Sequence, residues 1–382
     1  MIPLLRTRLD RYALPLVLSG AAAAAIYNWR LWERDKALLA RKGEAEPLLP
    51  LESWPERPMV SVLVAAWNER EHIERHIESF LALRYPHKEL VLCAGGDDDT
   101  LALASRYAGP QVKVFEQKPG EGKQRALVRC FAETRGEIIF LTDADCELSD
   151  TSFERTLWPV VSEGEKVATG CSRPYENQVA DPFTLCQWAP TFYLQTTNNS
   201  TKSPGILGRN VCLTRELLDQ AWDSDETVAT GTDYYLALRI RSRGQIIRRV
   251  PESEVATEFP GTAQHYLRQQ TRWVKNLVIW GLRFEDWHHV GVAAISMTLG
   301  ISMVILPLLL PVLGLPILLI YCVMWTHVIF ARFRYVRFLE TSENLPPTKV
   351  ILPAAILTAL VEFLAMARAA VGLIFKDSRD RW

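Results

Sequence analysis

The sequence lacks the patterns that mark several common classes of protein. Its seven cysteines, an odd number, include no Cys-x-x-Cys pair, so neither a zinc site nor a disulfide framework is indicated. The 43 basic residues are balanced by 44 acidic ones, which argues against a general nucleic-acid binder. No Gly-x-Gly-x-x-Gly follows the first predicted strand, and this disfavours a dinucleotide-binding fold.

Charged residues are also missing from one long stretch. Between Val290 and Ala331 there is no Asp, Glu, Lys or Arg over 42 residues, whereas a membrane-spanning helix needs about 20. Two helices joined tightly near residues 311–316 explain this run better than one long helix.

A third apolar stretch follows at Val350 to Phe375. It contains Glu362 and Arg368, which are costly in hydrocarbon unless they are paired, near an interface or facing a cavity. We therefore expect a C-terminal transmembrane region of about three helices at residues 289–376, followed by a tail at 377–382.

The N-terminal segment is a candidate membrane anchor. Tyr12 to Trp29 is uncharged and rich in alanine, a pattern that also describes a cleavable signal peptide. We expect it to be retained as an anchor at residues 1–32, with a linker at 33–57. More basic residues follow it than precede it, which favours a cytoplasmic position for what comes next. The same rule places a predicted loop with Arg332, Arg334 and Arg337 inside.

The globular part is predicted at residues 58–259 and begins with alternating strand and helix patterns. Such alternation is typical of an α/β domain with a parallel sheet and right-handed crossovers. Strands are predicted at 59–66, 90–93, 112–115 and 137–142, and helices at 71–83, 101–107 and 124–134.

Two carboxylates stand at the end of the fourth predicted strand. Asp143-Ala144-Asp145 closes the apolar run 137–142, and residues i and i+2 of a strand point to one side. Both acids could therefore bind one divalent ion at the sheet edge where open α/β folds bind ligands. An isolated Asp-x-Asp is more often an ordinary turn, so the interpretation depends on its context.

Five segments in order supply that context. They are 64–69 (Val-Ala-Ala-Trp-Asn-Glu), Gly122-Lys123, 143–145, 231–236 (Gly-Thr-Asp-Tyr-Tyr-Leu) and 269–273 (Gln-Gln-Thr-Arg-Trp). Together they resemble the membrane-integrated family 2 glycosyltransferases, the group that contains cellulose, chitin and hyaluronan synthases and ceramide glucosyltransferase-like enzymes. The resemblance implies a hexosyltransferase with a GT-A type Rossmann-like domain and flanking transmembrane helices. The basic residues after the anchor predict that this catalytic domain faces the cytoplasm.

The resemblance also implies the partners and the roles of individual residues. The donor is a nucleotide-sugar, expected to be a UDP-sugar, the cofactor is Mg²⁺ or Mn²⁺, and the acceptor is a membrane lipid or a glycan. Asp143 and Asp145 hold the metal, Asp233 is the general base, Arg272 faces the diphosphate and Trp273 packs against the acceptor. The nucleotide-sugar is contacted by Ala66, Asn68, Glu69, Asp97, Lys123, Asp143, Gln269 and Arg272.

The last motif lies on a predicted amphipathic helix at residues 260–288. We expect this helix in the membrane interface, with tryptophans at headgroup level and cations toward phosphate or water. Its apolar stripe is formed by Tyr266, Trp273, Leu277, Trp280, Phe284 and Trp287, and Arg268, Arg272, Lys275 and Arg283 lie off it.

Simpler structural roles compete with some of these assignments. Asp233 could be a helix N-cap, and Lys123 could be an exposed lysine at a helix start, although a cation is unfavourable there without an anion. His72 and His76 share a helix face among charged residues, and a solvated face is expected rather than a metal site.

Two departures from the family weaken the functional assignment. Most relatives carry an acidic pair after the second strand, which binds the base, whereas this chain has Cys93-Ala94. Asp97 or Asp98, or backbone groups of the glycine turn, are the candidates for that contact. Thr232 stands where relatives usually have glutamate.

The number of membrane helices bears on the product. Four helices can seat a lipid but hardly enclose a glycan pore, so transfer of one sugar to a membrane lipid is favoured. A processive polysaccharide synthase and an inactive, transferase-like nucleotide-binding protein remain the alternatives.

Overall fold

The computed structural model describes residues 2–41, 47–222, 226, 228–313 and 315–375. The predicted tail at 377–382 and part of the predicted linker lie outside these residues. The chain divides into two compact units, and each is described by itself. Among the described residues, the sheet unit comprises 47–176 and 199–258, and the helical unit comprises 2–41, 177–198 and 259–375.

The sheet unit is built on a mixed sheet. Its described strands follow the order β3-β2-β1-β4-β8-β6-β9-β5, and β7 also pairs with β9. The first four are parallel, and β8 then pairs antiparallel with β4, so the sheet is not all-parallel as the sequence predicts. The strands are β1 Val60–Trp67, β2 Lys88–Gly95, β3 Val112–Glu116, β4 Ile138–Leu141, β5 Cys146–Glu147, β6 Val167–Pro174, β7 Lys202–Ser203, β8 Val211–Thr214 and β9 Ile247–Thr257.

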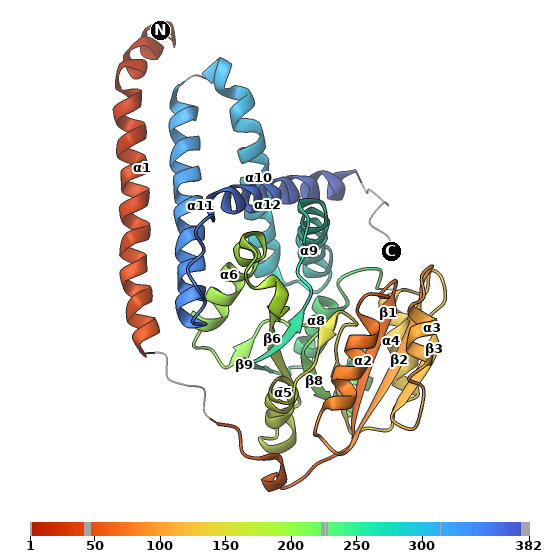
Figure 1. The fold of residues 1–382 in the computed structure, drawn as a ribbon. Helices are drawn as coiled ribbons and strands as arrows, with labels where there is room; N and C mark the ends of the chain where they lie inside the picture. Colours follow the sequence, from red (N-terminus) through yellow and green to blue (C-terminus); the bar gives the residue numbers. More distant parts are fainter. Residues whose placement is uncertain (1, 42–46, 223–225, 227, 314, 376–382) are drawn as a thin grey trace. The chain divides into compact units, whose positions relative to one another are not determined.

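Helices cover both faces of this sheet (Figure 1). One apolar core packs α2 and α5 against the sheet, and the other packs α4, α7 and α8. Neighbouring strand residues alternate between the two cores, as Val62 and Leu63 do, which explains the continuous apolar runs in the sequence. The predicted α/β fold is confirmed. The helices are α2 Ile73–Ala82, α3 Thr100–Ser105, α4 Gly122–Ala132, α5 Asp150–Ser162, α7 Arg215–Ala221 and α8 Thr232–Ser242.

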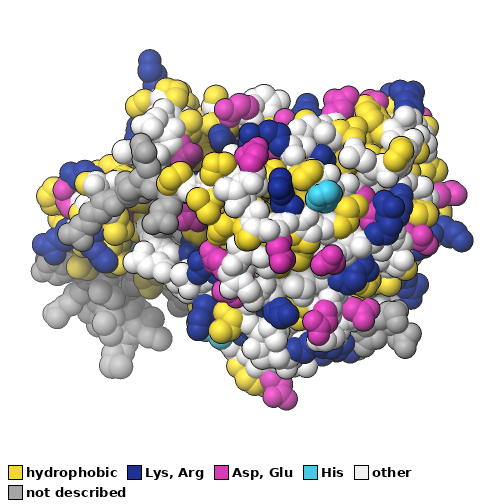
Figure 2. Space-filling view, turned by 90° about the horizontal axis from the view of Figure 1, so that it is seen from below, with side chains coloured by type: hydrophobic (Ala, Val, Ile, Leu, Met, Phe, Trp, Pro, Cys, Tyr) yellow, Lys and Arg dark blue, Asp and Glu magenta, His cyan; other side chains and the backbone are white. Residues whose placement is uncertain are grey.

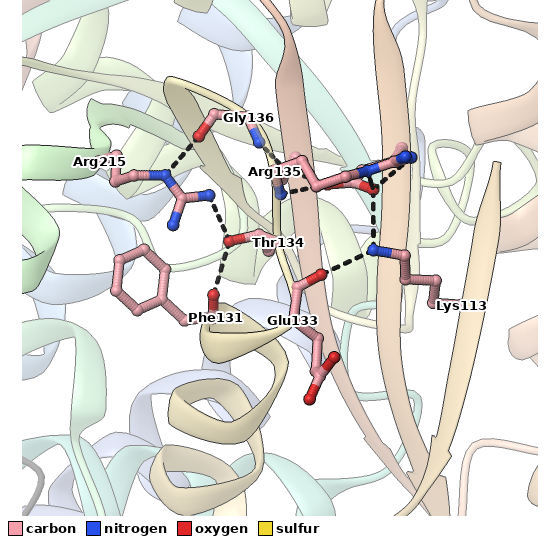
Figure 3. A network of polar contacts seen from close by, with 9 residues as sticks. Lys113, Phe131, Glu133, Thr134, Arg135, Gly136 and Arg215 are labelled. Carbon is pink, nitrogen blue, oxygen red and sulfur yellow. Dashed lines mark hydrogen bonds and ion pairs between the residues drawn. The ribbon is translucent and has the colours of Figure 1, made fainter. Parts of the chain in front are cut away.

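A buried carboxylate organises the amino ends of the parallel strands. Glu89 accepts hydrogen bonds from the Ser61 hydroxyl at 2.7 Å and from the Arg135 main-chain N–H at 2.6 Å. The Lys113 ammonium lies 3.3 Å from Glu89, and Figure 3 shows Lys113 and Arg135 converging there. Beside it, Arg215 donates to Gly136 O at 2.7 Å. This end of the sheet is therefore fixed by a polar network.

We expect Glu89→Gln to lower the free energy of unfolding by about 2 kcal/mol, because the buried Glu89 charge accepts hydrogen bonds from several donors, among them the partly exposed Lys113 and Arg135. The amide would also turn a donor toward the N–H groups that Glu89 now accepts from. Thermal unfolding of the two proteins measures the difference. The exposed Glu137→Gln is the matched control, and equal destabilisation by both substitutions would contradict this account.

The same carboxylate makes stability depend on pH. Burial alone would raise the pKa of Glu89, but hydrogen bonds from Arg135, Ser61 and Lys113 outweigh it and leave the pKa below its ordinary value. A lowered folded-state pKa stabilises the fold above the unfolded pKa of about 4.3, and this contribution is lost as pH falls through the folded value. The difference in unfolding temperature between wild type and Glu89→Gln should therefore shrink below about pH 4.3.

The helical unit contains the apolar segments. Three of its helices are long and apolar enough to cross a membrane, over Trp287–Leu309, Ile317–Ser342 and Leu352–Ile374. Helix α1 packs along α11, and α12 runs across α10 and α11 (Figure 1). The N-terminal anchor stays a prediction, because α1 is not among the three candidates found in the described residues. The helices are α1 Ile2–Arg41, α6 Pro182–Thr197, α9 Ala263–Arg283, α10 Trp287–Leu313, α11 Leu315–Ser342 and α12 Leu352–Ile374.

Two carboxylates of the helical unit, Glu362 and Asp35, are paired inside it. Glu362 accepts from Arg332 at 2.6 Å and from the Tyr266 hydroxyl at 2.7 Å, which joins α12 to α11 and α9. Asp35 accepts from Arg334 at 2.7 Å and from the Tyr193 hydroxyl at 2.9 Å, which joins α1 to α11 and α6. Pairing reduces the cost of placing these charges in an apolar environment.

The expected loop with Arg332, Arg334 and Arg337 is wrong. All three lie on α11, which continues to Ser342, and the first two are buried. The ion pairs explain why the helix tolerates them, so these arginines do not report on membrane orientation as loop charges would.

The surface agrees with the balanced composition. Figure 2 shows Lys and Arg side chains interspersed with Asp and Glu side chains over one face of the molecule. All seven cysteines are free, and six of them are buried, as expected of small apolar residues.

Candidate functional site

Asp143 lies just beyond β4, at the carboxyl ends of the parallel strands. One of its carboxylate oxygens accepts a hydrogen bond from the Lys123 ammonium at the start of α4, and the other lies 3.9 Å from Arg209 Nε. The Asp143 side chain is half-buried, so it remains accessible from this edge. Two cations therefore face the first acid of the Asp-x-Asp motif.

Asp145 is held from two other strands. Its Oδ2 accepts from the Thr257 hydroxyl at 3.2 Å, and Thr257 accepts from Arg209 at 3.0 Å. The Tyr175 hydroxyl, just past β6, donates to the main-chain oxygen of Asp145 at 2.6 Å. Arg209 thus contacts the surroundings of both acids and links them.

Asp233 belongs to the same cluster. Helix α8 starts at Thr232, and its N-cap is Gly231 with φ 73°, so the competing role of Asp233 as N-cap is not borne out. Burial alone would lower the pKa of Lys123, but the Asp143 charge and then the Asp233 charge outweigh it and raise the pKa. Gly208 packs closely against Asp233, since a Cβ there would lie 3.0 Å from Asp233 Cβ.

The turn after β1 contributes further polar groups. Asn68 adopts φ 59°, and its Oδ1 accepts from the Asp97 N–H at 2.7 Å, which joins this turn to the one after β2. Burial, and then the Asp145 charge, raise the pKa of Glu69 to about 8. Asp97 is exposed, whereas the Ala66 side chain is buried in the core, which leaves only its main chain for a ligand.

The expected solvated face of His72 and His76 is wrong. His76 is fully buried, its Nδ1 lies 2.7 Å from Cys146 O, and burial lowers its pKa. His72 Nε2 lies 3.1 Å from Glu258, and that hydrogen bond raises the pKa of His72. This face of α2 packs against the segment after β4, which the surrounding charges in the sequence did not indicate.

The Gln-Gln-Thr-Arg-Trp motif lies on α9 of the helical unit. Gln269 and Arg272 are half-buried, and Trp273 is 45% exposed. Tyr266, Trp273 and Trp280 are seven residues apart and so share one side of α9, as predicted, but Tyr266 and Trp280 are buried whereas Trp273 is exposed. Thr271, Lys275 and Asn276 are also buried, and Phe284 and Trp287 lie beyond the end of α9. The membrane position of this helix stays a prediction.

The donor set of the sheet unit suits a hard divalent cation. Asp143 and Asp145 offer carboxylate oxygens, and no cluster of three or more His, Cys, Asp or Glu ligands is found in the described residues. Mg²⁺ is commonly held by one or two carboxylates together with the phosphates of a substrate rather than by an all-protein cage. The residues present therefore fit Mg²⁺ or Mn²⁺ bound jointly with a diphosphate.

Sequence reasoning missed Arg209, Tyr175 and Thr257. Their roles arise because β6, β9 and the loop before β8 bring them to the end of β4, and no spacing in the sequence indicates this. The one available signal is the tripeptide Gly208-Arg209-Asn210, in which a cation stands between a glycine and an asparagine. Asn210 is fully buried in the structure.

Comparisons with known proteins agree on one family. A family model described as Glycosyltransferase like family 2 matches residues 57–276. The probable glycosyltransferase YdaM of Bacillus subtilis is 26% identical over 249 residues, which are 59% of this chain and 56% of that protein. The beta-monoglucosyldiacylglycerol synthase of Synechocystis is 26% identical over 268 residues, which are 65% of this chain and 56% of that protein.

A solved structure covers more of the chain. The mannosyltransferase PcManGT from Pyrobaculum calidifontis, in complex with GDP-Man and Mn²⁺, is similar with a TM-score of 0.50 and 19% identity. The likeness covers 97% of this chain and all of that one, and at this identity it shows the fold alone. By contrast, the chain spans little more than half the length of the two curated relatives.

Proposed function

The chain belongs to the family 2 glycosyltransferases, and we propose that it transfers one sugar from a UDP-sugar to a membrane lipid, with inversion at the anomeric carbon. The observation that carries the proposal is the clustering of Asp143, Asp145 and Asp233 around Lys123 and Arg209. Phosphate and sugar chemistry needs cations for a leaving diphosphate and a carboxylate for the attacking hydroxyl. One edge of the sheet unit holds both kinds of group.

Each residue of the cluster has a proposed role. Asp233 accepts the proton of the acceptor hydroxyl as that oxygen attacks the sugar, and the displacement needs no covalent intermediate. Lys123 and Arg209 hold the diphosphate, which then replaces Asp143 as their main anionic partner. Thr257 and Tyr175 keep Asp145 oriented while these charges rearrange.

Asp143 and Asp145 would hold Mg²⁺ or Mn²⁺, which supplies further positive charge to the leaving diphosphate. Arg272 is proposed to add a bidentate contact to the same diphosphate, and Trp273 to pack against the acceptor. Asn68, Glu69, Asp97 and Gln269 remain proposed contacts of the nucleotide-sugar.

The acceptor is inferred from the helical unit and from one relative. The three apolar helices provide a lipid-facing surface, and a relative named for synthesis of a glucosyldiacylglycerol supports a lipid acceptor. We also propose that the catalytic domain lies on the cytoplasmic side of the membrane, where nucleotide-sugars are made.

The product tests the proposal against its alternatives. Purified enzyme given a UDP-sugar, Mn²⁺ and membrane lipids should yield a product that partitions with lipid and carries one sugar by mass spectrometry. A product of many sugars, retained on a size filter, would assign the chain to the processive polysaccharide synthases. Neither transfer nor hydrolysis of the sugar nucleotide would favour an inactive transferase-like protein, to which Thr232 and Cys93-Ala94 point.

We expect Arg272→Lys to lower kcat about tenfold or more, because a guanidinium can bind two phosphate oxygens at once and an ammonium cannot. Steady-state kinetics in detergent measures the effect. Arg268→Lys is the matched control, because Arg268 is exposed one helical turn earlier on α9. Equal loss of activity in the two variants would mean that any Arg→Lys change on α9 lowers activity. The proposed contact of Arg272 with the diphosphate would then be wrong.

A further inference from the structure

Asn210 is a fully buried amide that directly follows Arg209 and precedes β8. Its carboxamide is bonded at both ends. The Nδ2 group donates to Cys171 O at 3.0 Å and to Ser253 O at 3.2 Å, and Oδ1 accepts from the Thr156 hydroxyl at 2.9 Å. Because a buried amide costs free energy wherever it lacks a partner, this set of hydrogen bonds holds the side chain in one orientation.

The carboxamide of Asn210 lies where the pairing of β6 with β9 is irregular. The register of the two strands shifts between Thr169 and Cys171. A Cβ at Gly170, between these two residues, would lie 2.2 Å from Asn210 Nδ2 and 2.7 Å from Ser253 O. Only glycine therefore lets the amide enter this place and bond to a carbonyl of each strand.

The main chain of Asn210 closes a turn that carries Arg209. The Asn210 N–H donates to Leu207 O at 2.8 Å, and the Asn210 carbonyl accepts from the Gly170 N–H at 2.9 Å. A bond between residues i and i+3 is typical of a β-turn, here with Gly208 and Arg209 at its central positions. The turn is thus attached to the sheet through both the main chain and the side chain of Asn210.

This turn contacts both the metal-binding acids and the proposed base. Arg209 donates to the Thr257 hydroxyl at 3.0 Å, and its Nε lies 3.9 Å from Asp143. Gly208 packs against Asp233 on the other side of the cluster. The Arg209 side chain is 18% exposed, so it can still meet a ligand. A shift of the turn by about 1 Å would spoil the geometry of a hydrogen bond from this guanidinium to a phosphate oxygen.

We propose that Asn210 is a positioning residue of the diphosphate site, an inference that rests on the proposed function. Its carboxamide fixes the turn so that Arg209 points at the phosphates of the nucleotide-sugar. Asn210 itself does not touch the donor, because its side chain is enclosed by α5, β6 and β9. It acts through Arg209, so its contribution to nucleotide binding should disappear when that guanidinium is absent.

A double-mutant cycle on UDP binding tests this coupling. In calorimetry of the full chain in detergent with Mn²⁺, Asn210→Ala should weaken UDP binding about tenfold in wild type and less than about twofold in Arg209→Met. Thr156→Val removes one donor to Asn210 at nearly constant volume and should show the same pattern with a loss of about threefold. This milder variant carries the cycle alone where Asn210→Ala does not fold.

Stability gives the readout that separates positioning from a general structural role. Thr156→Val should lower the unfolding temperature equally with and without the Arg209 guanidinium, although its effect on UDP affinity depends on that group. Ser61→Ala is the matched control, because it removes another fully buried hydroxyl, at the amino ends of the parallel strands. It should lower the unfolding temperature about as much as Thr156→Val does and leave UDP affinity unchanged.

Two kinds of result distinguish failure of the inference from failure of the proposed function. Wild-type UDP affinity in Thr156→Val, an equal loss in the Arg209→Met background, or an equal loss in Ser61→Ala would overturn the inference alone. If Arg209→Met binds UDP with Mn²⁺ as tightly as wild type does, or if wild type does not bind it, the proposed role of Arg209 fails and the inference fails with it.

Discussion

Asp143→Asn should lower turnover about a thousandfold, because the loss of a metal-holding carboxylate removes several kcal/mol of stabilisation from the leaving diphosphate. A chelator added to wild type should produce a loss of similar size, and Mn²⁺ should restore it. In Asp143→Asn, added Mn²⁺ should restore little of the lost turnover. Sugar transfer measured with a labelled nucleotide-sugar gives both values.

Stability must be measured beside activity in this variant. Asp143 faces Lys123 and Arg209, so the substitution also leaves two cations with less compensation. The thermal unfolding temperature should fall only modestly, since Lys123 is 41% exposed and can be solvated. Asp219→Asn, on the exposed surface of α7, should leave both activity and stability unchanged. Full wild-type activity in excess chelator would contradict the role of the metal.

Asp233→Asn should reduce transfer by a factor of about 10² to 10⁴, the range typical of a lost general base. Asparagine keeps the shape of the side chain and its packing against Gly208, so the fold should be retained. The affinity for UDP with Mn²⁺ should stay within about twofold of wild type, because the residue is assigned to the acceptor. Calorimetry and single-turnover kinetics separate the two effects.

A large loss of UDP affinity in this variant would place Asp233 on the donor side instead. Lys123 would explain that outcome, because the charges of both Asp143 and Asp233 raise its pKa. Lys123→Met should therefore weaken UDP binding more strongly than Asp233→Asn does.

The first half of the sheet unit could be predicted from local patterns. Strands β1, β2 and β4 are buried along almost their whole length and contain apolar runs in the sequence, and the Asp-x-Asp motif marks the end of β4. The later strands are harder to predict from the sequence. β8 pairs antiparallel with both β4 and β6, and β9 follows α8 in the sequence yet pairs with β6. Long-range pairing of this kind depends on topology rather than on residue spacing.

The parts of the site that were missed share one physical reason. Arg209 lies in a loop before β8 and reaches Asp143 only after the sheet is formed. His76 lies among charged neighbours in the sequence, yet the fold buries it against Cys146. The charged neighbours of His76 predicted a solvated face, but tertiary packing buries this residue.

The direction of α12 limits how this region can be threaded through a bilayer. A helix that runs across the α10–α11 pair cannot follow the bilayer normal together with that pair. Gly300, in the middle of α10, leaves room for the crossing, because a Cβ there would lie 2.5 Å from Met366. By length and hydropathy all three helices could span a membrane, but since α12 crosses the other two, the three do not share one direction.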